Sequence, residues 1–126
     1  MTIFVATASD MSSAFDLRLN DGDIDGLIAL LAPAAISRTP QGEVLNNPAD
    51  IRANLAGMIA AGARLENRLR QVMASGDVAL LLIDWTLELT AVPDAPPMTG
   101  TTANVVVRDA ATSGWRLAIL NPLGTA

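Results

Sequence analysis

The hydrophobic pattern changes its period at Gly62, and this change constrains the fold more than any other feature of the chain. Before it, apolar residues recur every three or four positions, as on one face of a helix. After it, they alternate with polar residues, as in a strand with one buried face. Helices followed by consecutive strands predict an α+β layer fold. The 126 residues match the usual length of one domain, which we expect to span residues 1–126.

Three helices are predicted in the first part of the chain. The first spans residues 10–20 and ends at Gly22, and the second spans residues 24–31 and is stopped by Pro33. The third, residues 48–61, starts in "NNPAD", where an asparagine caps the helix and a proline suits the first turn.

The strands predicted after Gly62 follow one another with short turns. They cover residues 64–74, 78–92, 100–109 and 115–122, and a shorter strand, residues 34–39, lies between the second and third helices. The first half of the 78–92 strand is apolar on both faces, but the helices can cover only one. We therefore expect a second copy of the chain to cover the other face, which predicts a homodimer.

Several residue types are missing from the composition, and their absence excludes whole classes of site. The chain has no cysteine, histidine, tyrosine or lysine, so disulfides, thiolate nucleophiles and cysteine-based zinc sites are excluded. Acid–base chemistry near neutral pH would then fall to aspartate and glutamate. The net charge of −5 opposes contact with phosphate backbones, so nucleic acid is not an expected partner.

The chain shows no targeting or membrane signal. The start, "MTIFVATASD", has no basic residue before its short apolar run, as a signal peptide would require. The apolar runs fall well short of the roughly 20 residues of a membrane helix. We expect a cytoplasmic protein of bacterial type with no membrane contact.

The acidic segment "NDGDID" resembles a calcium-binding loop but does not fit one. An EF-hand pattern set on its glycine would put Leu17 at the first ligand position and Ile28 at the twelfth, where carboxylates are needed. Helix caps explain these acids better, and no metal or cofactor is predicted.

Asp84 follows six apolar residues, and two interpretations of it remain open. Burial would raise its pKa towards the range of a general base, which makes it the candidate catalytic residue. Alternatively, strand alternation puts Asp84 on the wet face with Thr86 and Glu88, while Trp85 on the other face belongs to the core.

Arg18 falls within the apolar stripe of the first helix, where a buried guanidinium must find a partner. Its head could reach the mouth of a pocket and bind an acidic group of a ligand. The alternative is that its stem packs along the helix while its head reaches solvent.

Four segments together resemble the nuclear transport factor 2-like superfamily, in its ketosteroid isomerase-like and SnoaL-like branches: "LNDGDIDGLIALLA", "NNPADIRANL", "SGDVALLLIDW" and "GWRLAILNP". The resemblance covers nearly the whole chain. It implies a cone-shaped fold, in which a curved antiparallel sheet wraps three N-terminal helices around a central apolar pocket. Many relatives are dimers through the sheet face.

The resemblance also implies where catalytic residues would lie. Ketosteroid isomerases use an aspartate base with a tyrosine and a protonated aspartic acid that stabilise an oxyanion. Here the tyrosine position holds Phe15, the base position holds Thr39, and the second acid falls near Asn104. Of these three, the amide can still donate to a carbonyl oxygen. Many SnoaL-like relatives carry Asp and His near the end of the last strand, where this chain has Leu120 and Asn121.

The sequence therefore predicts a protein that binds an apolar small molecule and lacks the isomerase residues. The residues expected at the ligand are Phe15, Arg18, Thr39, Met58, Asp84, Asn104 and Leu120. Two alternatives stay open. One is an enzyme acting on an apolar substrate, an isomerase, cyclase or hydrolase, with Asp84 as general base. The other is a dimerisation module with a vestigial pocket.

Overall fold

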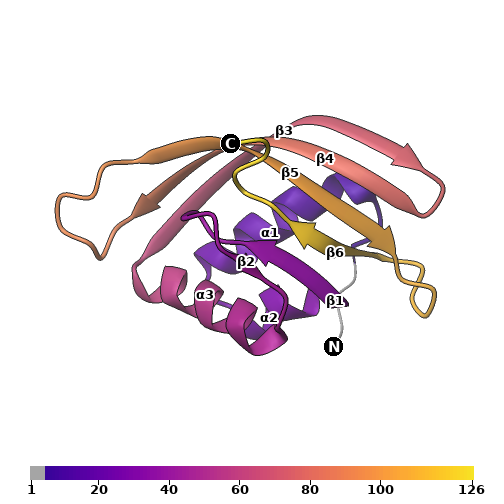
Figure 1. The fold of residues 1–126 in the computed structure, drawn as a ribbon, viewed down its shortest axis with the longest axis horizontal. Helices are drawn as coiled ribbons and strands as arrows, with labels where there is room; N and C mark the ends of the chain where they lie inside the picture. Colours follow the sequence, from indigo (N-terminus) through magenta and orange to yellow (C-terminus); the bar gives the residue numbers. More distant parts are fainter. Residues whose placement is uncertain (1–4) are drawn as a thin grey trace.

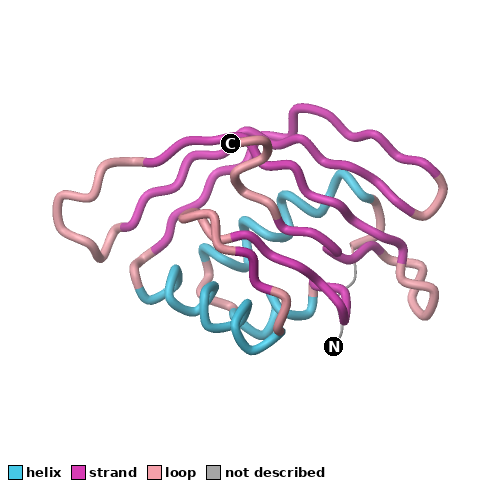
Figure 2. Tube along the Cα trace, in the orientation of Figure 1, coloured by secondary structure: helices cyan, strands magenta, loops and turns pink. Residues whose placement is uncertain are grey.

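The computed structural model describes residues 5–126, in which helices pack against one face of a curved, open six-stranded sheet (Figure 1). Figure 2 shows the same layers, with the helices in cyan on the concave side of the strands. The predicted α+β class is confirmed. The first four residues of "MTIFVATASD", the segment considered above as a possible signal peptide, lie outside the described residues.

The three α-helices form where the capping residues predict them. They are α1 (Met11–Asn20), α2 (Ile24–Ala29) and α3 (Pro48–Ala60), with a short 3-10 turn, Ala8–Asp10, before α1. The carboxylate of Asp23 accepts the Gly26 N–H at 2.9 Å, and the side chain of Asn47 accepts the Ala49 N–H at 2.8 Å. These bonds satisfy backbone groups that a helix start leaves unpaired.

The sheet has the strand order β2-β1-β6-β5-β4-β3. Its strands are β1 (Leu31–Arg38), β2 (Val44–Leu45), β3 (Ala63–Ser75), β4 (Val78–Leu89), β5 (Met98–Arg108) and β6 (Trp115–Leu120). All pairs are antiparallel, as expected for most of the sheet, except β1 with β6, which run parallel.

The strand β1 begins three residues earlier than predicted, and its first residue, Leu31, was expected at the end of α2. Pro33 lies inside the strand, between the paired positions Leu31 and Ile36, where the register with β6 is irregular. A proline is tolerated there because the ladder is already interrupted, so its missing N–H removes no regular hydrogen bond.

A bulge in β3 reverses the side-chain pattern along that strand. The pairing with β4 shifts between Leu69 and Gln71, so Arg70 is an extra residue and the following side chains change face. Val72 packs against the core and Met73 is 47% exposed, whereas simple alternation predicts Met73 on the same face as Leu65.

The hydrophobic core lies between the helices and the inner face of the sheet. In β4, Leu81 and Ile83 are buried there, in the same core cluster as the buried Leu19, Leu27 and Leu55 of the helical layer. None of the helices in residues 5–126 has the length and hydrophobicity needed to cross a membrane. The helical layer leaves one part of the inner face open, and a cavity forms at that place.

Candidate functional site

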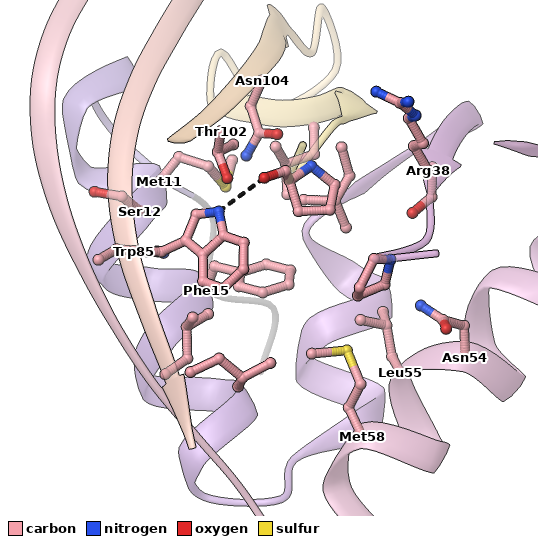
Figure 3. Close-up of a pocket in the computed structure, with 18 residues that line it drawn as sticks. Met11, Ser12, Phe15, Arg38, Asn54, Leu55, Met58, Trp85, Thr102 and Asn104 are labelled. Carbon is pink, nitrogen blue, oxygen red and sulfur yellow. Dashed lines mark hydrogen bonds between the residues drawn. The ribbon is translucent and has the colours of Figure 1, made fainter. Parts of the chain in front are cut away.

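A cavity opens between α1, α3 and the inner face of the sheet (Figure 3). Most of its wall is apolar, including Met11, Phe15, Leu55, Met58 and Leu120. Its volume is about 60 Å³, and a single water needs about 10–15 Å³. A cavity of this size holds a few waters or a small ligand group, and a larger ligand requires part of the wall to move.

Four buried polar side chains of the described residues interrupt this apolar wall: Ser12 from α1, Ser37 from β1, and Thr102 and Asn104 from β5. The backbone N–H of Asn121 donates to the side-chain oxygen of Asn104 at 2.8 Å. That bond fixes the orientation of the amide, so its NH₂ group is the part left to face the cavity. The hydroxyl of Ser37 is fully buried and has no hydrogen-bond partner.

These polar groups are neutral, and the cavity wall contains no carboxylate among the residues described. Among the described residues, the one charged side chain that lines it is that of Arg38, whose Nη2 donates to the backbone oxygen of Ala126 at 2.8 Å. A buried donor without a partner costs free energy, about 1–3 kcal/mol for a neutral group. The site can recover this cost from an uncharged ligand that supplies an acceptor oxygen.

Trp85 of β4 forms one wall of the cavity and is held from two sides. Its indole Nε1 donates to the carbonyl oxygen of Pro122 at 2.8 Å, the dashed line in Figure 3. Gly100 lies opposite it on β5, where an added Cβ would come within 2.6 Å of the ring. The ring therefore fits at this place because the neighbouring strand has no side chain there.

A polar seam joins α1 to the free edge of β3 beside the cavity. Asn20 accepts the Leu65 N–H at 2.7 Å and donates to the Leu65 carbonyl at 2.8 Å, while Asp16 Oδ2 accepts the Asn67 N–H at 2.8 Å. Asp16 and Asn20 are four residues apart on the helix, a rise of about 6 Å, and Leu65 and Asn67 are two residues apart on the strand, a rise of about 6.7 Å. The two distances match, so both pairs can form at once. Side chains of α1 thus take the place of a neighbouring strand at this edge.

Asp16 is the described carboxylate with the most strongly raised pKa. Burial raises the pKa of Asp16 from 3.8 to about 6; the Asn67 N–H opposes this rise and the charge of Glu66 adds to it. Its second oxygen, Oδ1, is buried without a hydrogen-bond partner. The ionised form is therefore incompletely compensated in the folded protein.

Four of the seven residues expected at the ligand line this cavity: Phe15, Met58, Asn104 and Leu120. Thr39 does not. It lies at the start of the turn after β1, where its hydroxyl accepts the Glu43 N–H at 3.1 Å, and it faces a separate open groove. Its hydroxyl is therefore used to stabilise the turn.

Arg18 also lies away from the cavity. Its Nη1 donates to the carbonyl oxygen of Gly26 in α2 at 2.7 Å. The guanidinium was predicted to need a partner, and the backbone of α2 supplies part of it. The guanidinium does not lie at the pocket mouth, where it was expected. The cavity rim carries Arg38 instead.

Asp84 lies on the outer face of the sheet, which corrects its expected position at the ligand. Arg70 Nε lies 3.3 Å from its Oδ2, and the Thr101 hydroxyl donates to its Oδ1 at 3.0 Å. The inward positions of β4 on either side are Ile83 and Trp85. The second of the two interpretations of Asp84, in which strand alternation puts it on the face away from the core, predicts this placement.

The sequence did not predict three features of this region: the cavity positions of Ser37 and Trp85, and the burial of Asp16. Ser37 points to the inner face of the sheet, as Ala35 does two residues earlier in β1. A polar residue among inward, apolar positions of the strand could therefore have indicated it. Asp16 had no such signal, because its burial depends on how β3 docks against α1. Within residues 5–126, no group of three or more acidic side chains is placed to hold a metal ion.

Comparisons with known proteins agree with this geometry. The family model of the SnoaL-like domain matches residues 13–118. A candidate calcium/calmodulin-dependent protein kinase type II association domain from Thiobacillus denitrificans is similar in structure, with a TM-score of 0.80 and 20% identity over 98% of this chain and 99% of that one. No curated protein sequence matches the chain.

Two further solved structures share the fold at similarly low identity. A ketosteroid isomerase-like protein from Erwinia carotovora atroseptica has a TM-score of 0.77 and 16% identity over 92% of each chain. A candidate dehydratase of the NTF2-like family from Streptomyces avermitilis has a TM-score of 0.74 and 21% identity, covering 92% of this chain and 91% of that one.

Proposed function

Because this chain belongs to the SnoaL-like domain family, whose fold suggests a ligand-binding or isomerase-like function, we propose that it binds an uncharged apolar small molecule. The ligand would lie in the cavity beneath the sheet and place an acceptor oxygen, such as that of a ketone or ester, at Asn104. The observation that carries this proposal is the Asn104 amide, whose NH₂ group faces an apolar cavity because its oxygen is bound by Asn121.

We also propose that binding is not followed by isomerisation. Phe15 lines the cavity where the resembled isomerases have a tyrosine, and it cannot donate a hydrogen bond. No described carboxylate lines the cavity, so a general base is missing at the point where a substrate proton would be removed. Asp84, on the outer face, cannot supply one.

Binding is tested with two matched probes, 2-acetylnaphthalene and 2-ethylnaphthalene, which differ in the carbonyl oxygen. We expect the parent to bind the ketone about tenfold more tightly, which is about 1.4 kcal/mol. Asn104→Ala should remove this preference, whereas Asn46→Ala, an exposed asparagine, should keep it. Calorimetry that finds no binding of either probe, or the same preference in all three proteins, would contradict the proposal.

The lack of isomerisation has its own test. A Δ5-ketosteroid should show no turnover with the parent protein above the rate in buffer. Turnover that disappears in Asn104→Ala would show that this cavity catalyses the reaction.

We propose, finally, that two copies pair through the outer face of the sheet. Paired positions on β1, β6, β5, β4 and β3 place an apolar row across it: Ile36, Ile119, Val105, Leu80 and Met73. Three members of this row, Ile36, Ile119 and Met73, are 41%, 39% and 47% exposed in one copy. A continuous exposed apolar row favours a partner surface.

Sedimentation at micromolar concentration tests the dimer. The parent should sediment as a dimer, and Leu80→Glu as a monomer, because a charge in the centre of the row would be buried without a partner. Leu17→Glu is the matched control, since Leu17 is 64% exposed on α1 and lies outside the row. A monomeric parent would refute the pairing.

A further inference from the structure

The chain after β6, residues 121–126, is fastened to the cavity wall at three points. The Asn121 N–H donates to Asn104 Oδ1, Trp85 Nε1 donates to the Pro122 carbonyl, and Arg38 Nη2 donates to the Ala126 carbonyl, each at 2.8 Å. The three wall residues line the cavity and belong to β5, β4 and β1. The segment therefore crosses from the β4 side of the cavity to the β1 side.

Internal contacts give this segment a defined shape. The Gly124 N–H donates to the Asn121 carbonyl at 3.2 Å, and Asn121 Nδ2 donates to the Gly124 carbonyl at 2.9 Å. Gly124 has a φ of +58°, and a Cβ added to it would come within 2.7 Å of the Thr101 carbonyl oxygen. The turn is therefore pressed closely against the backbone of β5, at a position that suits glycine.

The same segment differs from the strands in how it is attached. Among the described residues, one backbone–backbone hydrogen bond joins it to the sheet, from the Ala103 N–H to the Asn121 carbonyl, and its last two residues are exposed. Segments with few buried contacts and few backbone bonds open at lower free energy than the sheet that supports them. Residues 121–126 can thus separate from the wall while β4 and β5 stay paired.

We propose that residues 121–126 form a latch over one side of the cavity, and that this latch must release before a ligand of several rings enters. This inference rests on the proposed function, because it assigns regulation to the same cavity. The cavity of about 60 Å³ admits no ligand of several rings without movement of its wall. Release of Pro122 and of Ala126 frees Trp85 and Arg38 together, which opens the wall on two sides.

The test uses two glycines with the same backbone conformation. Gly124→Ala adds a Cβ that pushes the latch away from Thr101, and Gly124 does not line the cavity. Gly76→Ala is the matched control: Gly76 has a φ of +59°, and a Cβ added there meets nothing within 4 Å. Both substitutions carry the same backbone strain, and only Gly124→Ala carries the contact.

Latch opening is measured without any ligand. Hydrogen exchange at the amides of Asn121 and Gly124 should be at least tenfold faster in Gly124→Ala than in Gly76→Ala. Acrylamide quenching of Trp85, measured in a Trp115→Phe background for every protein, should increase about twofold in Gly124→Ala alone. Equal exchange and equal quenching in the two variants would overturn the latch.

Ligand entry is measured by stopped-flow fluorescence with the neutral apolar probe N-phenyl-1-naphthylamine. Its association rate should rise at least fivefold in Gly124→Ala and stay within twofold of the parent in Gly76→Ala. An unchanged rate despite faster exchange would overturn the gating role. If the probe binds none of the proteins, the proposed function fails, while exchange and quenching still decide whether the segment opens.

Discussion

Asp84 lies on the outer face of the sheet and Asp16 in the seam between α1 and β3, and the two carboxylates meet different partners. Asp84 has an arginine and a hydroxyl on its two oxygens. Asp16 has one backbone N–H on Oδ2, a buried Oδ1 without a partner, and a pKa raised to about 6 by burial. The acid that follows the apolar run is thus the better compensated of the two.

The reason for this difference is the geometry of the two places. On the outer face, cross-strand neighbours stand side by side, so β3 and β5 supply partners for an acid on β4. In the seam, a helix crosses the free edge of a strand, and the donor that Asp16 meets there is a backbone N–H of that edge. A carboxylate there is buried by packing and is only partly satisfied.

The largest expected effect distinguishes the two faces of β4 at neighbouring leucines. Leu81→Ala should lower the free energy of unfolding by about 2–5 kcal/mol, because Leu81 is fully buried against the helices and leaves a cavity. Leu82→Ala, on the half-buried outer side, should cost no more than about half as much. Urea unfolding at a concentration that keeps the protein monomeric measures both. Equal losses would show that the outer face is as well packed as the inner one.

Neutralising the seam carboxylate should stabilise the protein at neutral pH. The pKa of Asp16 is higher in the folded than in the unfolded chain, so its contribution to stability is full below about pH 3.8 and is lost as the pH rises through about 6. Asp16→Asn should therefore raise the free energy of unfolding at pH 8 by about 1 kcal/mol, a value reduced for solvent screening. Below pH 3.8 the variant and the parent should be alike.

Unfolding curves from pH 3.5 to 8 measure this effect. A variant that is less stable than the parent at pH 8 would mean that the charge of Asp16 is compensated in the folded protein, and the contrast between the two acids would be lost.

The smallest expected effect is at Asp84, and it has the opposite sign. Asp84→Asn should lower the free energy of unfolding by at most about 1 kcal/mol, because the pair with Arg70 is partly exposed. The difference from the parent should shrink in 1 M salt, which screens exposed charges. A loss of several kcal/mol that salt does not change would place Asp84 in a far more buried environment than the outer face provides.

The residues that line the cavity could be predicted where the helix or strand period is regular. Regular alternation gives Asn104 and Trp85 their inward side, and the apolar stripe of α1 gives Phe15. Thr39 follows the same alternation in β1 as Ser37, yet the turn that begins there takes its hydroxyl out of the cavity. A local hydrogen bond thus kept the expected Thr39 out of the cavity wall, which contains Ser37 instead.

The sequence by itself determined the elements and their order, because the period of apolar residues, the capping side chains and the turn glycines act over a few residues. It therefore predicts the three helices, the strands after Gly62 and the α+β class. The tertiary structure decided the parallel pairing of β1 with β6, the bulge at Arg70, the burial of Asp16 and the path of residues 121–126 over the cavity. Each of these depends on groups far apart in the chain that come into contact only after the sheet has formed. Short-range sequence patterns therefore do not predict them.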